Sequence, residues 1–205
     1  MFKLYYAPGT CALASHIALE EAGADYKTER LNFKSNQQNS PEYLAINPKG
    51  RVPSLVTDKG TVTETPAILA LIAQSFPQAK LAPSDPVAFA QAQSFNSYLC
   101  STVHVAHAHK LRGYRWASEE SSFADMKRKL PETMVGCFSL IENSMLKGPW
   151  VMGEQYTICD PYLFTIGLWL EGDGVDMKTL PKVMAHRKRM SERPAVLKVL
   201  AEEQA

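Results

Sequence analysis

Apolar residues change their spacing part-way along this chain. In the first part, short apolar runs alternate with segments of helical period, and the runs span residues 4–6, 26–31, 53–57 and 61–63. After residue 87 no strand pattern occurs, and apolar side chains recur at helical spacing. Alternating strands and helices are typical of an α/β domain, and a series of helices alone is typical of an all-α domain. We therefore expect the chain of 205 residues to form an α/β domain followed by an all-helical one.

The expected element order of the first part is βαβαββα. Its helices are predicted at residues 11–23, near 42–46 and from 64 onward, and the first βαβ unit is expected to cross over with a right hand. Three prolines in a stretch of little periodicity, Pro77, Pro83 and Pro86, predict a linker. The expected division is 1–77 for the α/β domain, 78–86 for the linker and 87–205 for the helical domain. Helices of the second domain are predicted near residues 88–106, 123–145, 158–171, 180–190 and 195–203.

The balance of charge gives little reason to expect a polyanionic partner. Twenty-two lysine and arginine residues face 21 aspartate and glutamate residues, for a net charge of +1. The basic stretch at residues 182–193 is interpreted as a solvated helical face, so we expect no nucleic-acid partner. No apolar stretch is long enough to span a bilayer, and the first residues lack the features of a secretory signal. The four cysteines include no Cys-x-x-Cys pair and are predicted to be free thiols, so we expect a cytoplasmic protein without a membrane partner.

Cys11 is the first candidate functional residue. It follows a predicted strand and a tight turn, and it opens a predicted helix. Free N–H groups and the positive end of the helix dipole stabilise an anion at that position, so a reactive thiolate is the functional interpretation. A small buried thiol that closes the turn is the structural alternative.

Two further segments suit the parts of a peptide ligand. Val52-Pro53 predicts a strand edge, a bend or a cis peptide that leaves the Val52 backbone free to pair with an extended peptide, and a plain trans turn stays open as an alternative. Glu64 and Thr65 offer a carboxylate, a hydroxyl and the N–H groups of a helix start. Together they suit the ammonium and carboxylate of an α-amino acid, and an ordinary helix cap is the alternative.

Polar residues in the long predicted helix form the third candidate group. Four of them are spaced to share roughly one helical face: Ser97, Cys100, His104 and His107. A histidine on that face could exchange protons with the Cys11 sulfur, or it could be an ordinary partly buried residue. A metal site that includes His109 is the third interpretation. We expect no metal, because His109 points away from the other two histidines and no carboxylate joins them.

Taken together, these residues resemble the cytosolic glutathione transferases, and most closely their bacterial beta class. Matching motifs lie, in the family's order, at residues 3–11, 45–53, 64–65, 157–164 and 191–194. The resemblance implies a thioredoxin-like N-terminal domain, an all-helical C-terminal domain and a homodimer. It also implies that glutathione is the co-substrate, that no metal is needed, and that the enzyme acts in detoxification or thiol redox chemistry.

The resemblance further implies a glutathione site. The residues that it assigns to this site are Cys11, Lys34, Val52, Pro53, Glu64, Thr65, Ser97, His104 and His107. Cys11 and His104 would face the glutathione sulfur, and His107 would lie one turn further along. The Val52 backbone would pair with the cysteinyl unit, before a cis Pro53.

The remaining implied roles concern the two ends of glutathione and the dimer. Glu64 and Thr65 would hold the γ-glutamyl end, and Lys34 would reach the glycyl carboxylate. Two positions depart from the family pattern. Ala12 stands where a serine is common, and Ser97 stands where beta-class members often carry an asparagine that reaches across the dimer.

The expected reaction is attack of a glutathione thiolate on a hydrophobic electrophile. Because a cysteine-like thiol with a pKa of about 9 is only about one per cent ionised at neutral pH, the protein must lower that pKa. The electrophile is expected near four aromatic residues, each of which could equally belong to the core: Tyr114, Trp116, Tyr162 and Trp169.

Three alternatives to this reaction stay open at the level of sequence. Cys11 could form a mixed disulfide with glutathione and act in single-thiol exchange, because Ala14 stands where a second redox cysteine would be. Tyr6 could activate the thiolate through its hydroxyl in place of Cys11. The chain could also be a non-catalytic ligand carrier or interaction protein, although sequence drift would not be expected to leave three matching site motifs.

Overall fold

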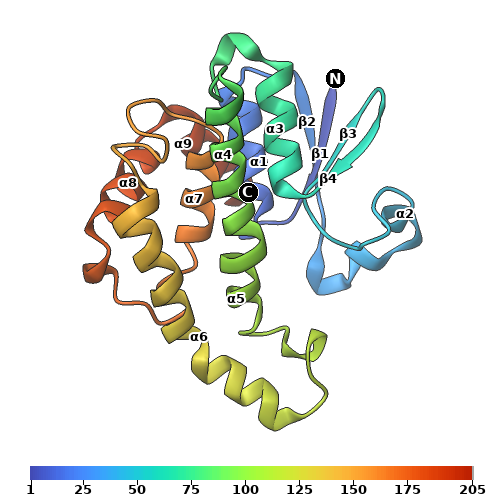
Figure 1. Ribbon diagram of the computed structural model, residues 1–205. Coiled ribbons are helices and arrows are strands. Elements are labelled where there is room, and N and C mark those ends of the chain that lie inside the picture. The colour runs from blue at the N-terminus through green and yellow to red at the C-terminus, as the bar shows by residue number, and fades with distance from the viewer. Residues whose placement is uncertain (205) are drawn as a thin grey trace.

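The computed structural model describes residues 1–204 and has a mixed sheet in its first part (Figure 1). The elements follow the expected βαβαββα order: β1 (Phe2–Tyr6), α1 (Ala12–Glu21), β2 (Tyr26–Arg30), α2 (Pro41–Leu44), β3 (Ser54–Thr57), β4 (Gly60–Thr63) and α3 (Thr65–Ser75). The strand order in the sheet is β2-β1-β3-β4, with β1 parallel to β2 and antiparallel to β3. The tight turn between β3 and β4 makes the predicted hairpin. This is the thioredoxin-like arrangement, so the predicted fold class is confirmed for the first domain.

The second part is helical, as predicted. Its helices are α4 (Pro86–Tyr98), α5 (His104–Ala108), α6 (Glu120–Leu140), α7 (Cys159–Gly167), α8 (Pro181–Ser191) and α9 (Pro194–Gln204). A 3-10 turn at Pro77–Ala79 and then irregular chain separate α3 from α4. The domain boundary that we placed at residues 78–86 stays a prediction.

Two of the helix predictions were wrong in detail. The stripe at residues 88–106 is not one regular helix, because a π-helical turn, Leu99–Val103, separates α4 from α5. The helix predicted at residues 158–171 ends at Gly167. After that residue the amides of Trp169 and Leu170 bond to carbonyls three residues back, and Gly174 closes the turn with a φ of 79°. The apolar pattern continues through this turn, so the pattern alone could not locate the end of the helix.

Helix α1 lies where the two parts of the chain meet. It packs against α3 of the first part and against α7 and α9 of the second (Figure 1). All side chains from Ala12 to Leu19 are buried, which fits a helix that is covered by neighbours on every side. One apolar core therefore runs from the sheet into the helical part, and it includes Leu55 of β3 and Leu99 of the π-helical turn. Cys11, at the start of α1, lies at this junction.

Polar contacts join α1 to the C-terminal helix and to the residue just before it. Arg193 donates two hydrogen bonds to the Glu21 carboxylate, at 2.5 and 2.7 Å. The buried His16 ring lies between two carboxylates, with Nδ1 3.2 Å from Glu203 and Nε2 3.3 Å from Glu202. These contacts, spaced along α1, hold α9 in place.

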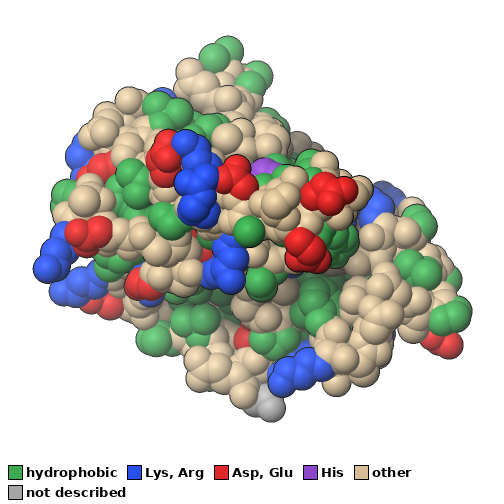
Figure 2. Space-filling view, turned by 90° about the horizontal axis from the view of Figure 1, so that it is seen from below, with side chains coloured by type: hydrophobic (Ala, Val, Ile, Leu, Met, Phe, Trp, Pro, Cys, Tyr) green, Lys and Arg blue, Asp and Glu red, His purple; other side chains and the backbone are tan. Residues whose placement is uncertain are grey.

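The surface seen from below in Figure 2 carries lysine, arginine, aspartate and glutamate side chains interspersed with apolar ones. No extended patch of one sign is visible on that face. None of the helices formed by residues 1–204 combines the length and the apolar character needed to cross a membrane. Cys11, Cys100, Cys137 and Cys159 are all free thiols, as predicted.

Candidate functional site

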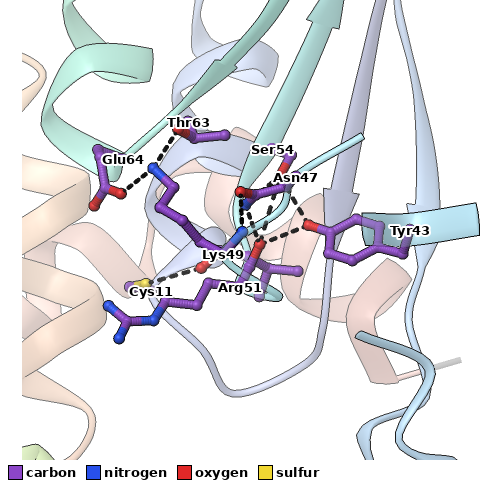
Figure 3. Close-up of polar contacts among 9 residues, drawn as sticks. Cys11, Tyr43, Asn47, Lys49, Arg51, Ser54, Thr63 and Glu64 are labelled. Carbon is purple, nitrogen blue, oxygen red and sulfur yellow. Dashed lines mark hydrogen bonds and ion pairs between the residues drawn. The ribbon is translucent and has the colours of Figure 1, made fainter. Parts of the chain in front are cut away.

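Cys11 occupies the N-cap position of α1 and is almost completely buried, with 8% of the residue exposed. Its Sγ donates to the carbonyl oxygen of Val52 at 3.6 Å (Figure 3). Burial raises the pKa of Cys11 to about 11, although a contact with the Thr65 hydroxyl and the charge of Arg112 both act to lower it. The expectation of a reactive thiolate was therefore wrong for the protein without ligand. Desolvation raises the pKa of Cys11 by more than the helix start lowers it. Cys11 is therefore a neutral thiol at pH 7 and a hydrogen-bond donor.

The Val52 segment is held by a buried polar network (Figure 3). The Tyr43 hydroxyl and the Asn47 amide donate to the Arg51 carbonyl, at 2.6 and 2.7 Å. Ser54 joins both side chains, at 2.8 Å from the Tyr43 hydroxyl and 3.1 Å from the Asn47 amide. The Val52-Pro53 peptide is cis, which decides between the alternatives left open by the sequence. Pairing of β3 with β1 begins only at Ser54, so Val52 lies outside the strand ladder and beside Cys11.

Glu64 and Thr65 lie at the start of α3, next to the site. Glu64 adopts a left-handed backbone with a φ of 74°, and its side chain makes no capping hydrogen bond, so the helix-cap alternative does not apply to it. Its carboxylate instead binds the ammonium of Lys49 at 2.5 Å, and Lys49 also donates to Thr63 at 2.6 Å. Thr65 is buried next to Cys11. Lys49 was missed in the sequence, where only Val52 and Pro53 of its motif were singled out.

His104 and His107 both lie on α5, with their ring centroids 6.4 Å apart. Burial, followed by the positive charge of Arg112, lowers the pKa of His104 to about 4. At pH 7 His104 is therefore a neutral imidazole, which can donate one hydrogen bond but carries no charge to stabilise a thiolate. Trp169 contacts both rings, with centroids 5.0 Å from His104 and 4.2 Å from His107.

The contact that brings Trp169 to the site is a hydrogen bond to the first domain. Its Nε1 donates to the carbonyl of Gly9 at 3.2 Å, in the turn before Cys11. His107 in turn bonds through Nδ1 to the buried carboxylate of Asp173, at 2.7 Å. Asp173 was not predicted. It lies 66 residues further along the chain, two residues beyond the predicted helix, so no local pattern could pair it with His107.

Several predicted site residues lie elsewhere. Tyr6 is buried with its ring 5.4 Å from His16, and its pKa is raised by burial and then by Glu203, so it faces the α1–α9 contact. Tyr162 is the exception: only 1% of it is exposed, so it does not line an open pocket as predicted, but its hydroxyl lies beside Thr65, Cys11 and Cys100. Tyr114 and Trp116 are exposed on the loop after α5, with Trp116 against His109. Lys34 and Ser97 are exposed, and the roles implied for them stay predictions.

Comparison with known proteins identifies the family. Residues 1–74 match the family model of the glutathione S-transferase N-terminal domain. The glutathione S-transferase GstA of Escherichia coli O157:H7 is 31% identical over 204 residues, which cover 98% of each chain. The chain belongs to the glutathione S-transferase family.

Solved structures agree with this assignment. A glutathione transferase homologue from Sulfitobacter, crystallised with bound glutathione, is 47% identical, with a TM-score of 0.97 over 100% of this chain and 99% of that one. A bacterial beta class glutathione S-transferase from Sphingomonas chungbukensis is 31% identical, with a TM-score of 0.85 over 98% of each chain. The transferase described here is thus an enzyme that uses glutathione as its co-substrate, as predicted.

The transferase offers no metal centre in the part of the chain that the structure describes, residues 1–204. No three histidine, cysteine, aspartate or glutamate side chains there are grouped so that they could hold a metal ion. His107 instead bonds to Asp173, and the His109 ring packs at a tilt against Trp116.

Proposed function

We propose that this transferase binds glutathione beside Cys11, stabilises its thiolate with the un-ionised Cys11 thiol, and conjugates it to an apolar electrophile. The observation that carries this proposal is the contact between Cys11 Sγ and the Val52 carbonyl, at 3.6 Å. With a pKa of about 11, Cys11 keeps its proton at neutral pH and has it available for a hydrogen bond. A glutathione sulfur that takes the place of the Val52 carbonyl would accept that bond as an anion, and charge-assisted bonds are the stronger kind.

The contacts of Glu64 support a γ-glutamyl site at the start of α3. Its carboxylate already binds an ammonium group, that of Lys49, at 2.5 Å. We assign to the same carboxylate the ammonium of glutathione, and to the Thr65 hydroxyl and the helix start its carboxylate. The backbone of Val52, which lies outside the strand ladder, pairs with the cysteinyl unit. Lys34 is assigned to the glycyl carboxylate.

The thiolate needs positive charge as well as hydrogen bonds. Lowering the glutathione pKa by one unit requires about 1.4 kcal/mol of preferential stabilisation of the anion. His104 is neutral at pH 7 and can supply only an N–H donor. Arg112 is half-buried, and its charge acts on Cys11 and on His104. We therefore assign the electrostatic part of thiol activation to Arg112 and not to a protonated histidine.

The raised pKa of Cys11 argues for conjugation over thiol exchange through this residue. A thiol of pKa about 11 is ionised in only about one molecule in ten thousand at pH 7, and the thiolate is the species that attacks a disulfide. A mixed disulfide on Cys11 would therefore form slowly. A glutathione thiolate held next to Cys11 is the more abundant nucleophile in this site.

The electrophile is proposed to lie against Trp169 and the loop after α5. Arg112 and Arg115 of this loop both act electrostatically on His104, which places the loop beside the site. Leu111, Tyr114 and Trp116 expose 78%, 64% and 46% of their surface on the same loop. Solvent-exposed apolar side chains next to a nucleophile suit an apolar electrophile.

The remaining assignments follow from family membership. We propose a beta-class homodimer that acts in the detoxification of electrophiles, with Ser97 facing the partner subunit. The free cysteines fit the reducing conditions of the cytoplasm.

Titration of bound glutathione tests the thiolate mechanism. The ultraviolet absorbance of the thiolate, followed against pH in the complex, should give a pKa one to two units below the value of about 9 for the free thiol. The Cys11→Ala variant should lose part of this shift, and Cys11→Ser, which keeps a donor, should lose less. A wild-type complex in which the pKa of glutathione stays at its free value would contradict the proposal.

A further inference from the structure

Asp173 is a buried carboxylate outside the residues assigned to glutathione. It lies in the turn after α7, and its side chain is 0% exposed. His107 Nδ1 lies 2.7 Å from Oδ2, and Lys110 Nζ lies 3.2 Å from Oδ1. Because an ionised carboxylate is costly to bury without partners, both contacts are needed to keep Asp173 inside the protein. The acceptor at Nδ1 also fixes the hydrogen of His107 on that nitrogen.

His107 transmits this constraint to Trp169. The two rings stack with their centroids 4.2 Å apart and their planes at 23°. The His104 ring lies 5.0 Å from the same indole, at 58°. An imidazole whose orientation is fixed by a carboxylate restricts the orientation of the indole stacked on it.

Trp169 in turn contacts the turn that leads into Cys11. Its Nε1 donates to the Gly9 carbonyl at 3.2 Å, and Gly9 has the left-handed φ of 71° that glycine tolerates at little cost. A hydrogen bond from the helical domain therefore holds a turn whose backbone is intrinsically free to move. The contacts from Asp173 to Gly9 form one continuous series that ends two residues before the catalytic thiol.

We propose that Asp173 is a positioning residue for thiolate stabilisation, which acts through His107 and Trp169 on the turn at Gly9. This inference rests on the proposed role of Cys11 as a donor to the glutathione sulfur. A shift of the turn moves Cys11 Sγ relative to that sulfur, but it leaves the γ-glutamyl end on Glu64 and Thr65. Loss of the Asp173 contact should therefore lower kcat and leave the KM for glutathione nearly unchanged.

The kinetic test compares three variants in conjugation of glutathione to chlorodinitrobenzene. Asp173→Ala should lower kcat roughly tenfold, the size expected when a hydrogen bond to a charged group is lost, with the KM for glutathione within about twofold of wild type. Asp173→Asn keeps an acceptor for His107 Nδ1 and should retain more than half of the wild-type kcat. Glu171→Ala removes an exposed carboxylate two residues away, which pairs with Arg187, and should have no effect.

The indole signal of Trp169 in a nitrogen-15 spectrum supplies a readout that a general loss of stability would not move. The signal is assigned by its absence in Trp169→Phe. It should shift towards the position of a free indole in Asp173→Ala and stay in place in Asp173→Asn. If Asp173→Ala does not fold, His107→Phe, which keeps a ring on the indole without the hydrogen bond, should show the same shift and the same fall in kcat.

Two results would overturn the inference: a folded Asp173→Ala with wild-type kcat, even if its melting temperature falls, or a Trp169 signal that does not move in the variants. Failure of the proposed function has a different signature. In that case the wild-type protein would show no conjugation and no shift of the glutathione pKa, and the indole signal would still report whether Asp173 positions Trp169.

Discussion

The Lys49 ammonium lies 2.5 Å from Oε1 of Glu64 and 2.6 Å from Oγ1 of Thr63. The protein thus places a positive group of its own on the carboxylate that we assign to the ammonium of glutathione. On this assignment the ammonium of glutathione takes the place of Lys49 on Glu64, so the Lys49 side chain acts as a competitor.

Replacement of Lys49 by methionine should therefore tighten glutathione binding. The ion pair is exposed on both sides and contributes about 1 kcal/mol or less, so we expect a two- to fivefold fall in the Kd, in the ~0.2–1 kcal/mol range of such pairs. Calorimetry with glutathione measures this directly. Lys59→Met, in the turn between β3 and β4, is the matched control. Weaker binding in Lys49→Met would show that Lys49 contacts glutathione itself.

Alkylation of Cys11 should depend steeply on pH. Because burial raises the pKa of Cys11 to about 11, the thiolate population should rise about tenfold per pH unit up to that value. Mass spectrometry of the peptide that contains Cys11, after brief treatment with iodoacetamide at several pH values, gives the rate. A plateau near pH 7 would mean that Cys11 is already ionised in the free protein.

Tyr6→Phe should leave conjugation within about twofold of wild type, a change worth ~0.4 kcal/mol in transition-state stabilisation. The Tyr6 ring packs against His16 on the α9 side of α1, so its hydroxyl is not at the sulfur site. Cys11→Ala, which removes the donor from that site, should lower kcat at pH 7 roughly tenfold. Steady-state rates of both variants test the two assignments together, and the opposite ranking would make Tyr6 the activating group.

His104 should make the protein less stable in acid. Its pKa is lowered from 6.5 to about 4 in the folded state, so between these values the unfolded chain binds more protons. The free energy of unfolding should therefore fall as the pH falls from about 6.5 to about 4, by up to about 1.4 kcal/mol per pH unit, and stay level above that window. Urea unfolding of wild type and His104→Phe at several pH values isolates this contribution, since all other histidines are shared. Equal slopes would exclude it.

Arg112→Gln should weaken thiol activation. Across residues 1–204 no carboxylate lies within ion-pair distance of Arg112, and its charge acts to lower the pKa of Cys11. Loss of that charge should raise the pKa of bound glutathione by about one unit and lower the rate at neutral pH by about tenfold, with recovery at higher pH. Arg128→Gln, which removes an exposed arginine paired with Asp125, is the control. A rate deficit that persists unchanged at high pH would argue against an electrostatic role.

Features fixed by neighbouring residues could be read from the sequence. The βαβαββα order, the helix start at Cys11 and the placement of Val52-Pro53 before a hairpin strand all depend on a few consecutive residues. The ionisation of Cys11 could not be read in the same way. Its helix-start position is local, but the burial that raises its pKa comes from residues distant in the sequence, among them Val52 and Thr65.

Contacts between residues distant in the sequence account for the remaining differences between the predicted and the observed site. Lys49 and Glu64 lie 15 residues apart, and His107 and Asp173 lie 66 apart, so neither pair has a spacing that identifies it. Tyr162 and Trp169 lie on the same predicted helix and look equivalent in sequence. Tyr162 lies within α7 and is buried beside Thr65, whereas Trp169, beyond the end of α7 at Gly167, reaches Gly9. The end of the helix therefore decides which contact Trp169 makes.

The ties between α1 and α9 limit how this enzyme can adjust to different substrates. Arg193 on Glu21, and Glu202 and Glu203 on His16, fasten the last helix to the helix that begins at the nucleophile site. Separation of α9 from α1 would break these contacts and expose the buried His16 imidazole. Selectivity for the second substrate should therefore evolve at the exposed apolar positions after α5, Leu111, Tyr114 and Trp116, and not at Arg112, which we assign to thiol activation.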